Sequence, residues 1–305
     1  MRHLVDFREW TGEEIVQLLD RALYMKRHPK EVGRPLEGRT MAMFFQKTST
    51  RTRLSFESGI FGLGGHAVYM DWRSTNFVLS EIRDEIRYVS GNCDIVMARL
   101  LHNEDLIEMA RFSSVPVING CCDKHHPCQA FSDLLTMLEL FGHLAGLHVV
   151  YAGVWNNVLN SLIEVCTKVG IYLTAVTPVV NAGAVDESRR REALESGYFR
   201  EAKDLASEAR CADIVYTDTW MDMEFFLDPR YEEEKRRRMD LLMPVQVNAR
   251  VLAGSKALVM HDMPVHAGCE IDREAIESDR SIIFQQSWNR MYAQNALVLR
   301  LLDII

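Results

Sequence analysis

The stretch Lys47-Thr48-Ser49-Thr50-Arg51-Thr52-Arg53 mixes hydroxyl-bearing side chains with cations, and the fold around it can be worked out from its neighbours. An apolar run at 41–45 precedes it, and a helical pattern begins at 54. This order predicts a strand, a turn and a helix N-terminus, where backbone N–H groups and the helix dipole favour an anion. Hydroxyls add neutral donors and arginine forks match phosphate oxygens in pairs, so we expect a phosphate site. The alternative is a Ser/Thr helix cap with solvated arginines.

Length and charge limit the class of protein. A chain of 305 residues is long for one core, so we expect two domains of about 150 residues. The net charge of −8 argues against a general nucleic-acid binder. No apolar run approaches the roughly 20 residues that cross a bilayer, and residues 1–6 lack the apolar core of a signal peptide. We therefore expect a cytoplasmic protein without a membrane partner.

The seven cysteines are odd in number and lack the spacing of a metal site. We interpret them as reduced thiols of a cytosolic protein. Zinc held by Cys121, Cys122, His125 and His126 is the alternative, but no spaced second pair completes a tetrahedral set. The sequence indicates no metal and no organic cofactor.

Strand-like and helix-like segments alternate along the chain, which predicts an α/β fold with a parallel sheet in each domain, flanked by helices. We expect strands at 39–46, 66–70, 95–98, 115–119, 148–152, 172–176, 214–217 and 257–260. We expect helices within 6–27 and at 54–61, 81–90, 103–112, 129–141, 158–169, 186–196, 204–210, 231–242 and 288–304. Thr11 and Glu14 form a predicted capping box. Residues 71–79 are polar and irregular, and we expect a mobile loop there.

Polar residues gather where the predicted strands end, which is where open parallel sheets bind ligands. They are Arg99, His125-His126-Pro127-Cys128-Gln129, Asn156-Asn157, Asp218-Thr219-Trp220 and His261-Asp262-Met263-Pro264, with Asn289-Arg290 at the start of the last helix. Gly153 follows a strand, but the glycine fingerprint of a dinucleotide site is absent, so we exclude that ligand.

Taken together and in this order, these motifs resemble the aspartate/ornithine carbamoyltransferase family, most closely its ornithine branch. The resemblance covers residues 4–302, and the pairing of Ser49-Thr50-Arg51-Thr52-Arg53 with His126-Pro127-Cys128-Gln129 is its specific part. It implies a carbamoyl-phosphate domain at 1–140, completed by the helix at 288–305, and an amine or amino-acid domain at 141–287. It also implies a homotrimer or a multiple of trimers.

The resemblance assigns roles to individual residues. The carbamoyl-phosphate site would comprise Ser49, Thr50, Arg51, Thr52, Arg99, His126, Gln129, Met263 and Arg290. Arg99 would bridge the phosphate and the carbonyl oxygen, and His126 would donate to that oxygen. Gln129 and the carbonyl of Met263 would hold the carbamoyl amide, while Arg290 would reach in from the last helix. For His126 and Arg290 the alternatives are a core histidine and a helix-start salt bridge.

The second-substrate half departs from the family pattern. The ornithine branch carries Asp-x-Trp-x-Ser-Met-Gly where this chain has Asp222 for the serine and Glu224 for the glycine. It also carries His-Cys-Leu-Pro, where this chain has Asp262 for the cysteine that would orient the amine, and Val154-Trp155 replaces an Asp-Gly. The predicted second-substrate residues are Asn156, Asn157, Asp218, Asp222, Met223 and Asp262. Arg99, His126, Asp218 and Asp262 are the predicted catalytic residues.

Added acid near a bound carboxylate would repel it, so the acceptor of the carbamoyl group is open. Ornithine, giving citrulline, follows from the overall resemblance. A diamine such as putrescine, or a modified ornithine or lysine, follows from the acidic substitutions. A catalytically silent regulatory homologue and a catabolic enzyme that splits a ureido compound with phosphate are further alternatives. Residues 71–79 resemble a loop that neighbouring subunits exchange, so Trp72, Arg73 and Asn76 would shape acceptor choice.

Overall fold

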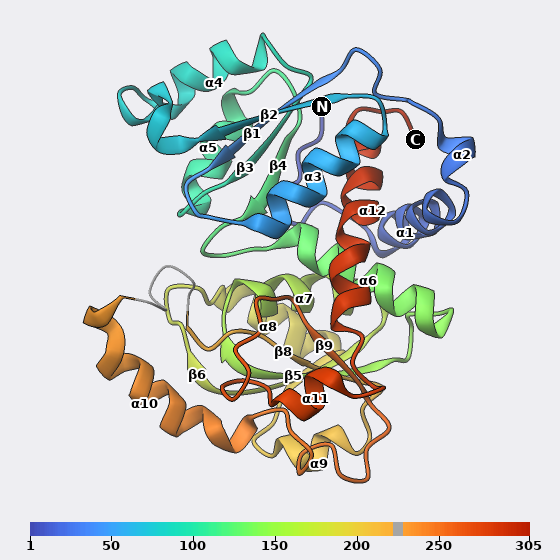
Figure 1. Cartoon of the computed structure of the whole chain (residues 1–305), viewed down its shortest axis with the longest axis vertical. Coiled ribbons are helices and arrows are strands. Elements are labelled where there is room, and N and C mark those ends of the chain that lie inside the picture. The colour runs from blue at the N-terminus through green and yellow to red at the C-terminus, as the bar shows by residue number, and fades with distance from the viewer. Residues whose placement is uncertain (222–227) are drawn as a thin grey trace. The chain divides into compact units, whose positions relative to one another are not determined.

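The computed structural model describes residues 1–221 and 228–305. The chain divides into two compact units (Figure 1). The first comprises Met1–Leu140 and Trp288–Ile305, and the second comprises Phe141–Ser287. Each unit is built on its own parallel sheet, so the predicted α/β class is confirmed.

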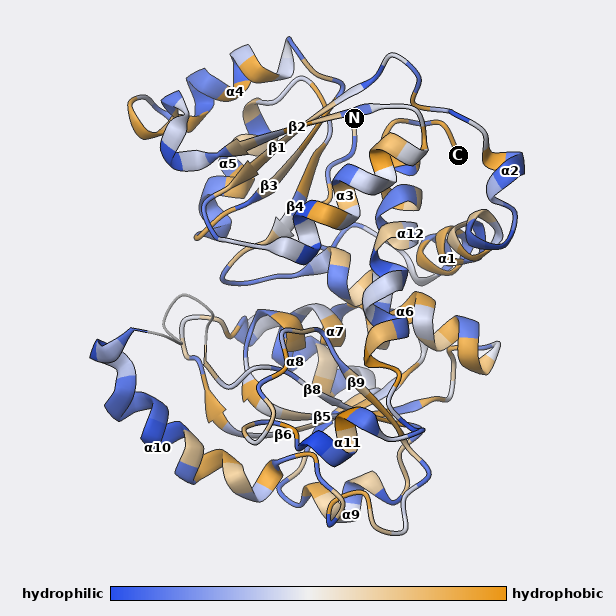
Figure 2. Cartoon of the chain, in the orientation of Figure 1, coloured by the Kyte–Doolittle hydropathy of each residue, from blue (hydrophilic) through white to orange (hydrophobic). Residues whose placement is uncertain are grey.

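The first unit holds a four-stranded sheet in the order β2-β1-β3-β4. Its strands are β1 (Thr40–Phe45), β2 (His66–Asp71), β3 (Ile95–Arg99) and β4 (Val117–Cys121). β3 and β4 are buried along their whole length and β1 nearly so, which explains their continuous apolar runs. β2 is an edge strand and is largely exposed. Figure 2 shows the apolar colour along β1 and β3.

Helices cover both faces of this sheet (Figure 1). They are α1 (Gly12–Arg27), α2 (Pro29–Val32), α3 (Thr50–Gly62), α4 (Ile82–Ser90), α5 (Asn103–Phe112), α6 (Pro127–Phe141) and α12 (Ile283–Leu301). α1 begins at the predicted capping box, in which Thr11 accepts the Glu14 N–H at 3.1 Å and Glu14 accepts the Thr11 N–H at 2.9 Å. α12 begins at Ile283, five residues before the predicted start, which was placed too late because the polar residues at 285–287 interrupt the apolar stripe.

Two aromatic side chains of the predicted mobile loop at 71–79, Trp72 and Phe77, are buried in the core, while most of its other residues are exposed. Two 3-10 turns, η1 (Trp72–Ser74) and η2 (Asn76–Val78), make up most of it. Trp72 and Phe77 stack at 4.5 Å and both contact Phe44 of β1, so their burial fixes the segment. The sequence did not predict these two aromatic anchors or the two 3-10 turns that they hold, because polar residues surround them.

The second unit holds a five-stranded parallel sheet in the order β7-β6-β5-β8-β9. The strands are β5 (His148–Trp155), β6 (Tyr172–Val180), β7 (Phe199–Glu201), β8 (Ile214–Thr217) and β9 (Leu258–His261). The helices are α7 (Asn157–Val169), α8 (Glu187–Ser196), α9 (Leu205–Ala209), α10 (Glu232–Leu242) and α11 (Arg273–Glu277), with 3-10 turns η3 (Pro229–Tyr231) and η4 (Met243–Val245). The short elements β7 and α11 were not predicted, because they span too few residues to show a period.

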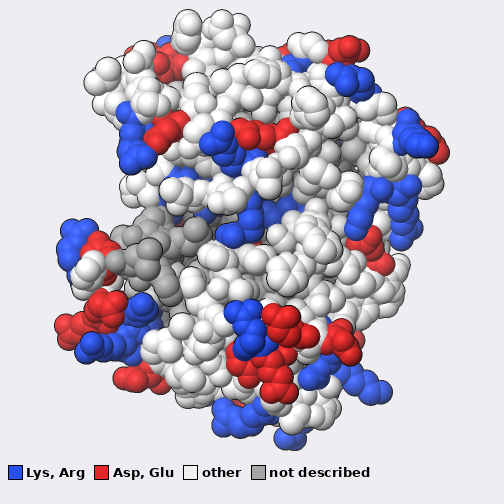
Figure 3. Space-filling view, in the orientation of Figure 1, with Lys and Arg blue, Asp and Glu red and all other residues white. Residues whose placement is uncertain are grey.

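The first part of α10 is hydrophilic and carries charges of both signs, and its last part is apolar (Figure 2; charges in Figure 3). Glu234 pairs with Arg237 at 2.7 Å and with Arg238 at 2.9 Å, three and four residues on. The solvated helix face predicted from this charge run is therefore confirmed. Among the helices that the described residues form, none combines the length and apolar character needed to cross a bilayer.

Candidate active site

The N-terminus of α3 follows β1 directly, as the opening motif predicts. Ser49 is the N-cap, and its hydroxyl accepts the Thr52 N–H at 3.2 Å. Ser49 therefore caps α3, as the alternative interpretation of the motif as a Ser/Thr helix cap predicts. The remaining N–H groups of a first turn lack acceptors within the helix, so they are suited to an anion.

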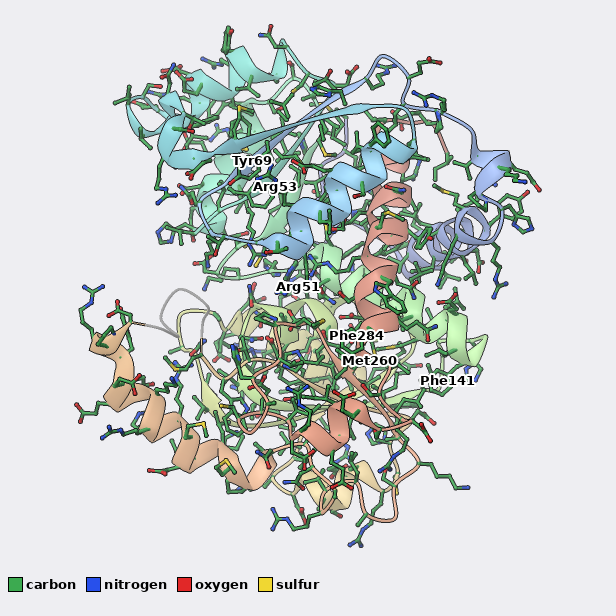
Figure 4. The ribbon with its side chains drawn as sticks, viewed as in Figure 1. Arg51, Arg53, Tyr69, Phe141, Met260 and Phe284 are labelled. Carbon is green, nitrogen blue, oxygen red and sulfur yellow. The ribbon has the colours of Figure 1, made fainter. Side chains whose placement is uncertain are left out.

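The two arginines of the motif behave differently. Arg53 lies over the Tyr69 ring at 3.7 Å and pairs with Glu57 at 3.1 Å, so it ties α3 to β2 (Figure 4). Arg51 lies at the N-terminal end of α3, and its charge acts on the buried His126 (Figure 4). Of this pair, only Arg51 takes part in the candidate site.

Arg290 of α12 links two elements of the first unit. Its Nη2 donates to Thr52 Oγ1 at 2.8 Å, and its Nη1 donates to Gln129 Oε1 at 2.7 Å. Thr52, Gln129 and Arg290 are each at least 97% buried. These two contacts of Arg290 are hydrogen bonds to neutral side chains, and so they differ from the salt bridge that was the alternative prediction.

His126 is buried at the start of α6, among cations. Burial and then the charges of Arg290, Arg99, Arg51 and Lys47 lower its pKa well below the usual value. The ring is therefore neutral near pH 7, with one N–H to donate. Arginines from β3, α3 and α12 therefore lie close enough to His126 for their charges to act on it. Their roles in binding a ligand stay a prediction.

The cysteines near His126 serve packing. Burial raises the pKa of Cys122 and of Cys128 to about 12, so both are thiols at neutral pH. Cys128 Sγ lies 3.5 Å from the Asn119 carbonyl, and Cys122 Sγ accepts the His125 N–H at 3.3 Å. All seven cysteines are free in the structure, which agrees with the reduced-thiol interpretation.

In the second unit Asp218 follows β8 and Asn156 follows β5. The Asn156 amide donates to Asp218 Oδ2 at 2.6 Å, while its oxygen accepts the N–H groups of Val158 and Leu159. Asn156 is thus the N-cap of α7 and also holds Asp218. Asn157 is the first residue of that helix, directly beside this cap. We interpret Asn156 as a residue that positions Asp218.

Asp218 and Asp262 form a buried carboxyl pair. Burial, the charge of Asp262 and a hydrogen bond with Asp262 raise the pKa of Asp218 well above its usual value. This shift favours the protonated, neutral form of Asp218 beside Asp262. The Thr219 N–H and the Asn156 amide fix the Asp218 oxygens at 2.6 Å each.

His261 is held from both ring nitrogens. Nδ1 accepts the Met263 N–H at 2.8 Å, and Nε2 donates to Glu270 Oε1 at 3.0 Å. Because Nδ1 accepts, its 3.6 Å approach to Asp262 Oδ1 is not an ion pair. Met263 itself has a φ of 63°, a left-handed conformation that this hydrogen bond helps to hold.

Asp218, His261 and Asp262 place potential metal ligands within 4.8 Å of one another, which invites a metal interpretation. However, a metal needs a ring lone pair, and both His261 nitrogens are already committed to Met263 and Glu270. Two carboxyl groups then remain, which is fewer protein ligands than a metal site usually has. We therefore assign no metal to this cluster.

Some predicted residues lie elsewhere. Asp222, Met223 and Glu224 are outside the described residues. Trp220 packs into the core of the second unit, and its carbonyl accepts from Arg238 at 2.9 Å. In the 71–79 segment, Trp72 is likewise a core residue, and Arg73 pairs with Asp71 at 2.7 Å.

The sequence analysis missed Asp133 and Glu270. Asp133 accepts the Gln129 amide at 2.8 Å and lies one helical turn beyond it, so the i,i+4 spacing on α6 was the available signal. Glu270 is fully buried and accepts from His261 and from the His266 N–H at 2.6 Å. Burial alone would raise the pKa of Glu270, but its hydrogen bonds outweigh burial and lower the pKa to about 2. Nothing in the sequence near Glu270 indicated this role.

Comparison with known families agrees with this geometry. The family described as "Aspartate/ornithine carbamoyltransferase, carbamoyl-P binding domain" matches residues 2–139, and "Aspartate/ornithine carbamoyltransferase, Asp/Orn binding domain" matches residues 145–301. The ornithine carbamoyltransferase of Thermococcus kodakarensis is 37% identical over 97% of this chain and 95% of its own. That of Cenarchaeum symbiosum is 38% identical, with 98% of both chains covered.

Solved structures extend the match to three dimensions. The ornithine carbamoyltransferase of Pyrococcus furiosus aligns with a TM-score of 0.89 at 37% identity, covering 98% of this chain and 96% of that one. The enzyme of Thermus thermophilus aligns with a TM-score of 0.87 at 34% identity, covering 98% of both. The chain therefore belongs to the aspartate/ornithine carbamoyltransferase family.

Proposed function

We propose that this protein transfers the carbamoyl group of carbamoyl phosphate to the side-chain amine of ornithine, giving citrulline and phosphate. The carrying observation is the convergence of Arg51, Arg99 and Arg290 on the neutral His126. A cluster of cations is complementary to a phosphate dianion. The named relatives supply ornithine as the acceptor.

The reaction needs no cofactor. A neutral amine attacks the carbamoyl carbon, the bond from that carbon to the phosphate oxygen breaks, and the amine's proton leaves with the phosphate as HPO₄²⁻. Arg99, Thr52 and the neutral N–H of His126 would stabilise the oxyanion that forms on the carbonyl. The remaining cations would stabilise the departing phosphate, and binding both reactants on one molecule can contribute roughly 7–11 kcal/mol.

The two units would divide the substrates. The first unit, residues 1–140 with 288–305, would bind carbamoyl phosphate, with Ser49, Thr50, Arg51 and Thr52 as the cradle. The second unit, residues 141–287, would bind the amine. Asp218 and Asp262 would hold it, positioned by Asn156, and the Met263 carbonyl would contact the carbamoyl amide.

A second acceptor class is favoured by one observation, the buried pair of Asp218 and Asp262. Two carboxyl groups suit a primary ammonium, and an acceptor without its own carboxylate would avoid repulsion. A diamine such as putrescine fits this description. The substitution of Asp222 and Glu224 for uncharged residues of the ornithine branch points the same way.

An acceptor panel separates these alternatives. Purified protein would be incubated with carbamoyl phosphate and ornithine, N-acylated ornithine, lysine, putrescine or aspartate, and ureido product would be measured. Ornithine turnover at least tenfold above the others supports the main proposal, whereas putrescine turnover without ornithine turnover supports the diamine. No product with any amine would favour a silent homologue. Phosphate-dependent cleavage of citrulline, measured in parallel, tests the catabolic direction.

We also propose that the protein is a cytoplasmic homotrimer. The first unit exposes apolar side chains on and near α3 and its sheet edge, as a subunit contact would require: Leu54, Phe61, Val68, Tyr69, Val78 and Leu79. Light scattering coupled to size-exclusion chromatography tests this, and a mass near 35 kDa, that of one chain, would contradict it.

A further inference from the structure

The amide of Gln129 lies between an arginine and a carboxylate. Its Oε1 accepts from Arg290 Nη1 at 2.7 Å, and its Nε2 donates to Asp133 Oδ1 at 2.8 Å. Gln129 and Asp133 are fully buried in α6, and Arg290 is 97% buried. Water therefore cannot take the place of either partner.

The chemistry of the two neighbours fixes which way this amide points. A guanidinium can only donate hydrogen bonds, so it must face the oxygen of Gln129. The Gln129 nitrogen then faces Asp133, whose carboxyl oxygen accepts its hydrogen bond, as an ionised carboxylate must. Rotating the amide by half a turn would set donor against donor at Arg290 and acceptor against acceptor at Asp133. Both contacts thus select one orientation independently of each other.

We propose that Asp133 is a positioning residue that makes Gln129 present its carbonyl oxygen to the ligand, so that the site selects an acyl phosphate bearing an N–H group. This inference rests on the proposed function. A carbonyl oxygen has two lone pairs, and Arg290 uses one of them. The other is oriented to accept from the amide nitrogen of carbamoyl phosphate. Acetyl phosphate has a methyl group there and would leave the buried oxygen without a second donor.

An acid at position 133 has a property that an amide lacks. Asparagine has nearly the same shape, but its own amide can rotate and donate to Gln129, which would let Gln129 rotate as well. The carboxylate excludes that arrangement. Asp133→Asn should therefore weaken selectivity without removing a side chain, and Asp133→Leu should weaken it further.

The measured quantity is the ratio of the dissociation constants of acetyl phosphate and carbamoyl phosphate, obtained by titration calorimetry, with inorganic phosphate as a third ligand. We expect the ratio to fall roughly tenfold or more in Asp133→Leu and less in Asp133→Asn, because a site built for an N–H group rejects the analogue that lacks it. Phosphate affinity should change by less than about threefold, since phosphate does not need Gln129. Thr136→Val is the matched control, a buried polar residue one turn further along α6 that accepts from Asn289 and makes no contact with Gln129 in the hydrogen bonds described.

A charge swap provides the rescue. In Gln129→Glu with Asp133→Asn, the acid moves to position 129, where it can accept from Arg290, from the new amide at position 133 and from the ligand N–H. The double variant should recover selectivity relative to Asp133→Asn, a result that a purely structural role for Asp133 would not give. If Asp133→Leu fails to fold, this pair of variants carries the test.

The outcomes separate this inference from the proposed function. An unchanged ratio in folded Asp133→Leu and Asp133→Asn overturns the inference, as does equal weakening of all three ligands. Wild-type protein that prefers carbamoyl phosphate to acetyl phosphate yet forms no ureido product would overturn the proposed function and leave the inference standing. Wild-type protein that binds none of the three ligands overturns both.

Discussion

The two units keep a buried titratable group neutral by opposite means. In the first, burial and surrounding cations lower the pKa of His126, so the imidazole carries no charge. In the second, burial and Asp262 raise the pKa of Asp218, which favours its protonated, neutral form. Each cluster gathers groups of one sign of charge. The comparison indicates that the first unit is preorganised for an anion and the second for a cation.

Removing a cation from the first cluster should have the largest effect. We expect Arg51→Ala to lower kcat/KM for carbamoyl phosphate by about 10³-fold, the upper end for loss of one charge-stabilising donor. The thermal midpoint should hardly change, because a cation gathered among other cations contributes little to stability. Steady-state kinetics at varied carbamoyl phosphate and a thermal scan provide the two measurements.

The same helix offers the control for this prediction. Arg53 carries the same charge two residues later but contacts Tyr69 and Glu57. Arg53→Ala should reduce activity less than about tenfold, since an exposed ion pair of this kind is worth little. Similar losses in both variants would refute the distinction between the two arginines.

Removing an acid from the second cluster should have the next largest effect. Asp218→Asn should lower kcat/KM for the amine by about 10²-fold while leaving the dissociation constant of carbamoyl phosphate within about twofold. Steady-state kinetics at varied amine, combined with calorimetric titration of carbamoyl phosphate, provides the measurement. Loss of carbamoyl-phosphate affinity would show that the clusters are not specific to opposite charges.

Asp262 sharpens the comparison, because it is where the second cluster departs from its family. Asp262→Cys introduces the residue of the ornithine branch. If the acidic pair selects a carboxylate-free amine, the ratio of putrescine to ornithine turnover should fall about tenfold, near the value of one lost charge contact. An unchanged ratio would indicate that Asp262 does not select the acceptor. Asp262→Asn, which keeps the size of the side chain, controls for volume.

Much of the first cluster could be predicted from the sequence, since its residues lie at predicted strand ends and in one specific pair of motifs. Arg51 and Arg99 were placed there in this way. Asp133 and Glu270 could not be, because their roles depend on contacts with other side chains. The burial of Trp72 was not predicted, because its neighbours in the sequence are polar. The sheets were predicted well, since buried parallel strands leave apolar runs that need no tertiary information.

The smallest expected effect concerns stability against pH. The pKa of Asp218 is raised in the folded protein, so the folded state holds its proton over a range where the unfolded chain, with a pKa of about 3.9, has lost it. The Asp218 contribution to stability is therefore complete below about pH 4 and declines as pH rises toward the folded pKa. Asp218→Asn removes this decline, so its thermal midpoint should rise relative to that of the wild type as the pH increases above about 4.

Asp94 provides the contrast of opposite sign. Burial alone would raise the pKa of Asp94, but hydrogen bonds from Arg39 and the Thr40 N–H outweigh burial and lower it, so its contribution is present above about pH 4 and lost below it. Asp94→Asn should therefore lower the thermal midpoint at about pH 7, and the two proteins should converge as the pH falls through the lowered folded pKa of Asp94. Calorimetric scans of both variants across this range distinguish an acid strained for function from one that stabilises the fold. If Asp218→Asn instead lowered the thermal midpoint at about pH 7, as Asp94→Asn should, the carboxyl pair would stabilise the fold. The second unit would then not be preorganised for a cation.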